Sequence, residues 1–177
     1  VALSGTSLAG LLLIAALLAL LLGTGLTASA VYITMVATVI PILKESGVSD
    51  IAAHMFAFYF GVVSDITPPT ALAAVTAAGI ARSHPVQTML QASRIGIAAF
   101  IVPFMFVYSP ALLMQGTWDE ILRASLTASA GLACLAAALA GHAWRDLRSW
   151  ERVVLASCCA LLVADEFWSD AIGLAIA

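Results

Sequence analysis

A short polar stretch, residues 64–70, interrupts an apolar segment that is long enough to cross a lipid bilayer. Two adjacent prolines lie in it, and because proline lacks a backbone N–H and clashes with the preceding helical turn, a helix should break there. Unwound carbonyls, hydroxyl oxygens and a carboxylate can together replace the hydration shell of a hard cation such as Na⁺. An acid at membrane depth indicates a functional site. The candidate residues are Ser64, Asp65, Thr67, Pro68, Pro69 and Thr70. The alternative is a structural kink in which Asp65 bonds the freed backbone groups.

A second cluster of small and hydroxyl residues lies upstream, and it consists of Gly23, Thr24, Gly25, Thr27 and Ser29. Its glycines weaken a helix, and its hydroxyls and free carbonyls could serve the same ion chemistry. Simple small-residue packing is the alternative. The spacing of Gly23, Gly25 and Ala28 also matches a loose dinucleotide-binding fingerprint, but that motif requires a preceding strand and Leu8–Leu22 has a helical Leu/Ala composition. We therefore reject nucleotide binding.

The composition identifies the class of protein that must position these residues. Of 177 residues, 63% are hydrophobic and 10% are charged, and the mean hydropathy is +1.08. Soluble domains carry about 25% charged residues, so we expect an all-α, polytopic membrane protein. The net charge of -3 does not suggest a nucleic-acid surface. The three cysteines, Cys134, Cys158 and Cys159, have no metal-ligand spacing.

The apolar runs on either side of the Gly23–Ser29 cluster are each shorter than the roughly 20 residues that one crossing needs. The runs Leu8–Leu22 and Ala30–Leu43 therefore predict a re-entrant hairpin over residues 8–43, with its tip at the cluster. A discontinuous helix is expected over residues 51–81, capped by Ser49 or Asp50. A long span with Arg94 and Pro103 is expected over 86–113.

Further helices are expected over residues 118–141 and about 150–168. Thr117 and Glu120 have the spacing of a capping box, which predicts where the first of these begins. If each span crosses once, loops 82–85 and 142–152 share one side and hold four arginines. Positively charged loops are cytoplasmic, so the hairpin should enter from the outer face.

The remaining polar residues indicate no enzyme. His54, His84 and His142 lack a carboxylate partner at metal-ligand spacing, and His54 is expected to face protein. Arg94 is expected to reach the cytoplasmic interface or to brace a helix contact, with direct anion binding as the alternative. Asp65 alone at depth does not supply the two facing acids of an intramembrane aspartyl protease.

Two segments, His54–Ala81 with its Ser64-Asp65-Ile66-Thr67-Pro68-Pro69-Thr70 core and Arg94–Leu113, resemble the large membrane subunit of tripartite ATP-independent periplasmic (TRAP) transporters. They are most similar to the fused permeases of the TAXI type. The resemblance implies that residues 1–116 form the C-terminal repeat of an elevator-type transporter, and that residues 117–177 form accessory transmembrane helices. The family's tip usually reads Gly-Met-Gly-Leu-Pro-Thr-Thr, and this chain departs from it at Thr24, Thr27 and Ala28.

The resemblance further implies secondary active import of a small organic acid, coupled to Na⁺ or H⁺, with no other cofactor. Na⁺ is expected at Thr67, Asp65 and Gly25. The expected partners are a periplasmic TAXI-type substrate-binding protein, the N-terminal remainder of the permease and the lipid bilayer of a bacterial inner membrane, and no nucleic acid. Because one repeat is present and the chain begins at Val1, we expect a piece of a longer permease. A non-transporting membrane scaffold is the alternative function.

Overall fold

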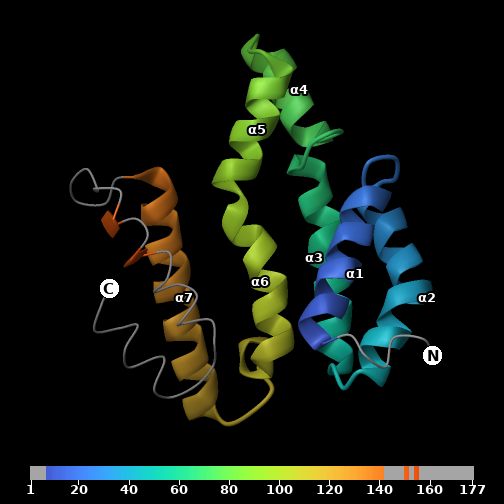
Figure 1. Cartoon of the computed structure of the whole chain (residues 1–177), viewed down its shortest axis with the longest axis vertical. Helices are drawn as coiled ribbons and strands as arrows, with labels where there is room; N and C mark the ends of the chain where they lie inside the picture. The colour runs from blue at the N-terminus through green and yellow to red at the C-terminus, as the bar shows by residue number, and fades with distance from the viewer. Residues whose placement is uncertain (1–6, 142–149, 152–153, 156–177) are drawn as a thin grey trace. The chain divides into compact units, whose positions relative to one another are not determined.

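The computed structural model describes residues 7–141, 150–151 and 154–155, and it has no strand within these ranges. The prediction of an all-α protein is thus confirmed for the part described (Figure 1). The elements in chain order are α1 (Leu8–Leu22), α2 (Ala28–Glu45), α3 (Asp50–Val63), the 3₁₀ turn η1 (Ser64–Ile66), α4 (Leu72–Ala81), α5 (Pro85–Ile95), α6 (Ile97–Tyr108), the 3₁₀ turn η2 (Pro110–Leu113) and α7 (Trp118–Ala140).

The chain divides into two compact units, residues 1–107 and residues 108–177. In the first unit, α1 and α2 run antiparallel and both pack on α3 (Figure 1). Side-chain caps mark where they start, since Ser7 Oγ accepts from Gly10 N at 3.3 Å and Thr27 Oγ1 accepts from Ala30 N at 3.4 Å. The 15 residues of α1 are too few to cross a bilayer. The 18 residues of α2 are enough, because α2 runs from Ala28 to Glu45 and extends beyond the predicted run Ala30–Leu43 at both ends.

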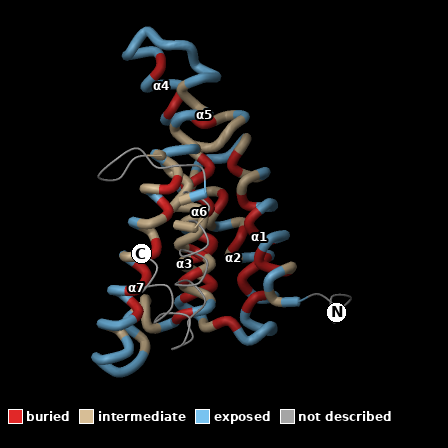
Figure 2. The backbone as a smooth tube through the Cα atoms, turned by 60° about the vertical axis from the view of Figure 1, so that its left-hand side comes forward, coloured by how far each residue is buried: buried red, intermediate tan, exposed pale blue. Residues whose placement is uncertain are grey.

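The core of this unit lies between α1, α2 and α3, where buried residues concentrate (Figure 2). The helix α1 buries the face that carries Leu12, Ala15 and Ala19, which recur at helical spacing. Its other face leaves large apolar side chains exposed, namely Leu13, Ile14, Leu17, Leu18 and Leu21. An apolar face of this kind suits contact with lipid acyl chains.

Aromatic rings connect α3 to α6. The ring of Phe104 meets those of Phe56 and Phe60 edge to face, with centroids 5.5 and 5.7 Å apart. The ring of Tyr59 meets that of Phe106 in the same way at 5.3 Å. Edge-to-face pairs add stabilisation beyond the area that they bury, so the aromatic run of α3 sets the position of α6.

The predicted broken helix is present as two helices, α3 and α4, with the turn η1 between them. Ser49 caps α3, because its Oγ accepts from Ala52 N at 3.3 Å. Helices α4 and α5 then lie side by side as an antiparallel pair (Figure 1). No residue of α5 is buried, whereas α4 buries Ala74 and Ala78.

The predicted span 86–113 is interrupted. Helix α5 ends at Ile95, Gly96 has φ -79° and ψ 9°, and α6 begins at Ile97. Helix α6 then ends at Tyr108, because Ser109 precedes Pro110 and takes φ -126° and ψ 86°. Pro103, expected mid-way along this span, lies within α6.

Three stretches of the described chain are long and apolar enough to cross a membrane: Ala28–Glu45, Pro85–Tyr108 and Trp118–Ala140. These spans suit a multi-pass membrane protein. The re-entrant course of the hairpin and the cytoplasmic side of loop 82–85 stay predictions.

The second unit contains η2 and α7. The predicted capping box is confirmed at the start of α7, where Thr117 N donates to Glu120 Oε2 at 2.9 Å. One face of α7 is buried, through Ala124, Thr127, Ala128, Gly131, Leu135 and Ala138. The predicted division of the chain at residues 116 and 117 stays a prediction. The span predicted near 150–168, most of loop 142–152, Cys158 and Cys159 lie outside the described residues.

Candidate functional site

The broken helix changes course over a few residues. After the 3₁₀ turn, Thr67 takes extended angles of φ -103° and ψ 129°, as expected for a residue before proline. The peptide bond between Pro68 and Pro69 is cis. The buried Ala71 then takes a left-handed conformation with φ 37°, and α4 starts at the next residue. A non-glycine residue in this region costs about 1–2 kcal/mol, so the surrounding packing must hold the break in this form.

Hydroxyl groups bond the backbone carbonyls around the break. Ser64 Oγ donates to Gly61 O at 2.6 Å, and Thr67 Oγ1 donates to Val63 O at 2.7 Å. A third hydroxyl comes from α5, where Ser93 Oγ donates to Ile66 O at 2.9 Å. Unwound backbone is tolerated at membrane depth where such partners are supplied. The break is therefore supported by two of its own hydroxyls and by one from α5.

Asp65 has a different environment. Its side chain is partly exposed, and it makes no hydrogen bond or ion pair with any residue that the structure describes. In the alternative interpretation, a structural kink, Asp65 bonds the freed backbone groups. Serine and threonine hydroxyls bond backbone carbonyls at the break instead.

The turn between α1 and α2 is held by local bonds. Gly23 N donates to Ala19 O at 2.9 Å, and Thr24 Oγ1 donates to Leu21 O at 2.7 Å. Thr27 caps α2, and Ser29 is exposed in the first turn of that helix. Gly25 is exposed, and a Cβ added there would meet no atom within 4 Å. Gly25, Thr27 and Ser29 are therefore exposed, whereas Gly23 is buried.

The structure brings the tip and the break together at one place. Gly23 is buried against Ser64, and a Cβ on Gly23 would overlap both Cβ and Oγ of Ser64. Thr70 Oγ1 also donates to Gly23 O at 3.4 Å. Among the described residues, no bond joins Thr24, Gly25, Thr27 or Ser29 to the break. Of the predicted site, Gly23, Ser64 and Thr70 are therefore in contact.

Three further residues support this region and were missed by the sequence reasoning. Besides Ser93, these are Gly96 and Gly61. A Cβ on Gly96 would lie 2.5 Å from Ile66 Cδ1, and a Cβ on Gly61 would lie 3.1 Å from Ala28 O. Glycines inside apolar helical patterns are the signal that could have indicated such close approaches.

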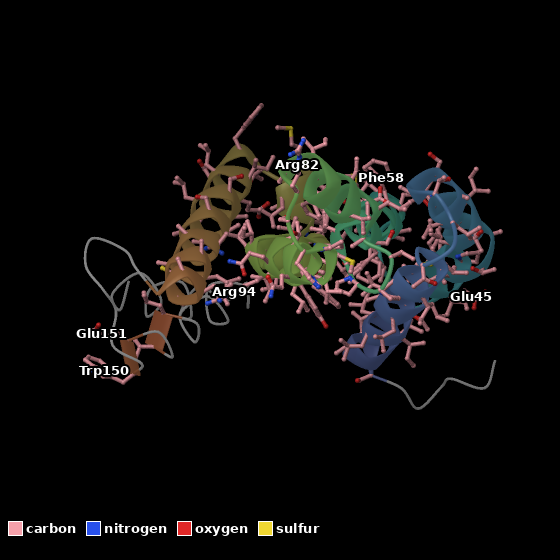
Figure 3. The ribbon with its side chains drawn as sticks, turned by 90° about the horizontal axis from the view of Figure 1, so that it is seen from above. Glu45, Phe58, Arg82, Arg94, Trp150 and Glu151 are labelled. Carbon is pink, nitrogen blue, oxygen red and sulfur yellow. The ribbon has the colours of Figure 1, made fainter. Side chains whose placement is uncertain are left out.

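Of the other polar residues that the sequence singled out, His54 lies on α3 and Arg94 on α5, next to Ser93. His54 is half-buried on α3, and its Nδ1 is 2.9 Å from the hydroxyl oxygen of Tyr32 on α2. Arg94 is exposed on α5 (Figure 3). Within the described ranges, no group of three or more His, Cys, Asp or Glu residues could hold a metal ion. A cation at the break would therefore depend on oxygen ligands from hydroxyls and carbonyls as well as Asp65.

Residues 1–121 match the family model described as the tripartite ATP-independent periplasmic transporter, DctM component. This range covers the hairpin, the broken helix, α5, α6 and the start of α7. No curated protein and no solved structure matches the chain.

Proposed function

The chain belongs to the DctM family, the large membrane component of TRAP transporters, and from this premise we propose that it forms part of a secondary active permease for a small organic acid. The family implies a lipid bilayer, a periplasmic substrate-binding protein and a small membrane subunit as partners. In our proposal the binding protein is of the TAXI type, and the chain is a C-terminal part of its permease in a bacterial inner membrane. Na⁺ or H⁺ supplies the driving force.

The observation that carries this proposal is the contact of the hairpin tip with the broken helix. Gly23 packs against Ser64 where α3 unwinds, and the partly exposed Asp65 is adjacent to Ser64 without a bonding partner among the described residues. Discontinuous helices whose ends meet an ion or a substrate recur in secondary transporters. The proposed ion ligands are Thr67, Asp65 and a backbone oxygen near Gly25.

An organic acid is the proposed substrate because the N-termini of two helices, α2 and α4, follow the tip and the break. Backbone N–H groups and the helix dipole favour an anion at such positions. In this proposal the hairpin is re-entrant, and the repeat moves as one body of an elevator. No observation favours the scaffold alternative.

The test is uptake of radiolabelled carboxylates by proteoliposomes that hold the complete permease and its binding protein. Asp65→Leu and Thr67→Val should abolish uptake driven by an ion gradient. Thr76→Val is the matched control, because Thr76 Oγ1 donates to Leu72 O at 2.8 Å on the exposed face of α4. Uptake unchanged in both site variants would contradict the site.

A further inference from the structure

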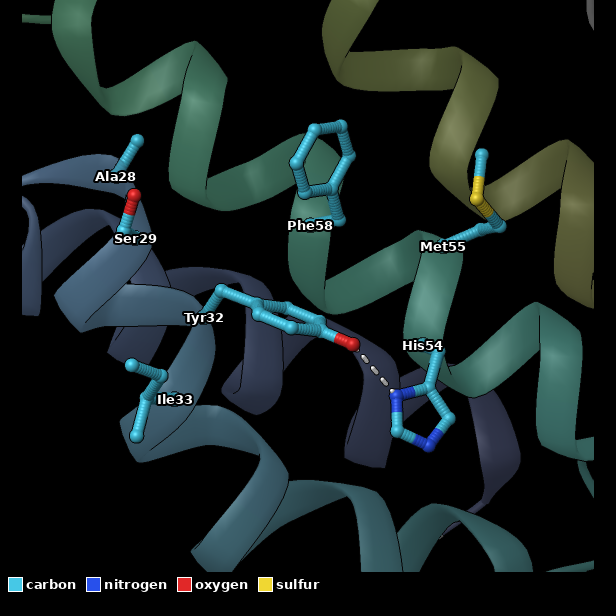
Figure 4. Close-up of a pocket in the computed structure, with 7 residues that line it drawn as sticks. All are labelled: Ala28, Ser29, Tyr32, Ile33, His54, Met55 and Phe58. Carbon is cyan, nitrogen blue, oxygen red and sulfur yellow. Dashed lines mark hydrogen bonds between the residues drawn. The ribbon is translucent and has the colours of Figure 1, made fainter.

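A groove of about 640 Å³ lies between α2 and α3, and its lining residues are Ala28, Ser29, Tyr32, Ile33, His54, Met55 and Phe58 (Figure 4). Its volume is in the range of small-molecule sites, and its lining is mostly apolar with a few polar groups, as in such sites. One end lies at the first turn of α2, beside the hairpin tip. The other end lies at His54, one turn into α3.

One hydrogen bond crosses the groove, between the hydroxyl oxygen of Tyr32 and Nδ1 of His54 at 2.9 Å (Figure 4). The other ring nitrogen, Nε2, lies 3.8 Å from Asp50 Oδ1. A carboxylate repels a ring nitrogen that presents a lone pair, so the proton of the neutral ring belongs on Nε2. Nδ1 is then an acceptor, and the Tyr32 O–H donates to it.

The charge beside His54 is fixed by Asp50. Lys44 Nζ lies 2.6 Å from Asp50 Oδ1, and its hydrogen bond and positive charge lower the pKa of the exposed Asp50 carboxyl below its ordinary value of 3.8. Asp50 is therefore ionised throughout the range from about pH 5 to 8 in which an imidazole ordinarily changes charge. Two other helices pack on α3. Helix α1 carries no titratable residue, and α6 contacts α3 through the uncharged rings of Phe104 and Phe106.

Addition of one proton to His54 changes the bonding in the groove. The proton joins Nδ1 and the ring becomes an imidazolium with two N–H donors. Nε2–H then faces the Asp50 carboxylate, and Nδ1–H donates to the Tyr32 oxygen. The Tyr32 O–H can no longer donate to His54, so it is free to rotate and donate to another acceptor.

We propose that this groove is a carboxylate-binding site that becomes competent when His54 takes up a proton. The proton supplies a positive charge, and it releases the Tyr32 hydroxyl as a donor to the anion. Ala28 and Ser29, in the first turn of α2, line the same groove, at the helix end that favours an anion. Ile33, Met55 and Phe58 contact the apolar body of the acid. This inference rests on the proposed transport function and deepens it, since it makes the proton the ion bound together with the substrate.

The experiment is solid-state NMR of the full chain, labelled in its histidine rings and held in lipid bilayers, titrated from pH 5 to 8. His54 is assigned by loss of its signal in His54→Gln, and His84 by loss of its signal in His84→Gln. The probe is benzoate, and benzamide is the uncharged control. Because linkage is reciprocal, benzoate should raise the proton affinity of His54 about fivefold or more, and benzamide should not.

His84, exposed in the loop before α5, serves as the reference and should titrate identically with and without benzoate. In Tyr32→Phe the benzoate effect should be weakened, because only the positive charge of His54 is left to attract the anion. A proton affinity of His54 that benzoate leaves unchanged would overturn the proposal, and so would a benzoate effect undiminished in Tyr32→Phe.

The outcome separates this site from the transport function. A benzoate effect at His54 in a permease that shows no uptake would support the groove and count against transport. Normal uptake without a benzoate effect at His54 would support transport and count against the groove.

Discussion

Gly23 and Ser64 lie against each other at the point where the hairpin tip meets the broken helix, and the absent Cβ of Gly23 leaves the space that the Ser64 side chain fills. Ser64 is 2% exposed, and its hydroxyl is turned back to Gly61 O. The two residues thus fix how closely the tip can approach the break.

Gly23→Ala should disrupt this contact, because the new methyl group overlaps Ser64. Overpacking of this kind costs about 1–3 kcal/mol. Gly25→Ala is the control, since a Cβ there meets no atom within 4 Å, and it should change stability by less than about 0.5 kcal/mol. Thermal unfolding in detergent measures both. Partial rescue of Gly23→Ala by Ser64→Gly would confirm that the contact is direct, and equal effects of the two glycine variants would contradict it.

Gly61 and Gly79 should respond in opposite directions to alanine. A Cβ on Gly61 would lie 3.1 Å from Ala28 O, so Gly61→Ala should push α2 away from α3 and destabilise the fold. A Cβ on Gly79 meets nothing within 4 Å, and alanine is favoured in a helix by about 0.5–1 kcal/mol, so Gly79→Ala should stabilise α4. The measurement is again the unfolding temperature, and a shift of the same sign in both variants would refute the prediction.

Ser93→Ala should destabilise the break from a distance in the sequence. It removes the hydroxyl that donates to Ile66 O, and a carbonyl left without a partner costs about 1–3 kcal/mol. Ser129→Ala removes an exposed hydroxyl that donates to Leu126 O within α7, and it should have a much smaller effect. Hydrogen exchange of the backbone amides of residues 64–67, 70 and 71 would locate the change, and exchange rates left unchanged by Ser93→Ala would contradict the prediction.

Lys44→Gln should alter the acid titration of Asp50. Because Lys44 lowers the pKa of this carboxyl, its removal should return the pKa toward the ordinary 3.8. A carboxyl with a lowered pKa stabilises the fold above its unfolded pKa, and this contribution is lost as the pH falls through the folded value. In Lys44→Gln this contribution should be smaller, so the stability should fall less as the pH drops below the ordinary value of 3.8. NMR of the Asp50 carboxyl carbon gives the pKa directly, and Glu45→Gln, which removes a neighbouring charge of the opposite sign, is the control.

Local signals in the sequence located the helices well. The apolar run that ends at Leu22 is α1, and the two prolines at 68 and 69 mark the break between α3 and α4. These features are local, because proline lacks an N–H and apolar periodicity follows one helix. The end of α6 was also encoded locally in Pro110, but the expected span ran on to residue 113.

Contacts between helices were not predictable in the same way. Nothing in the local pattern pairs Gly23 with Ser64, or Ser93 with Ile66, because each pair joins separate elements. Tyr32 did not stand out at all, since a single tyrosine in an apolar helix is ordinary until its hydroxyl meets His54. The ion and substrate site stays a prediction that the uptake experiment tests.

The bonds of the hairpin tip have a consequence for its motion. The turn is stabilised within itself, by Thr24 bonding back to Leu21 and Thr27 capping α2, while a single 3.4 Å hydrogen bond from Thr70 reaches it from the break in the described chain. One such bond contributes about 0.5–1.5 kcal/mol, which is comparable to thermal energy. The turn is therefore expected to move as one unit, and the packing of Gly23 against Ser64, more than this hydrogen bond, holds it on the break.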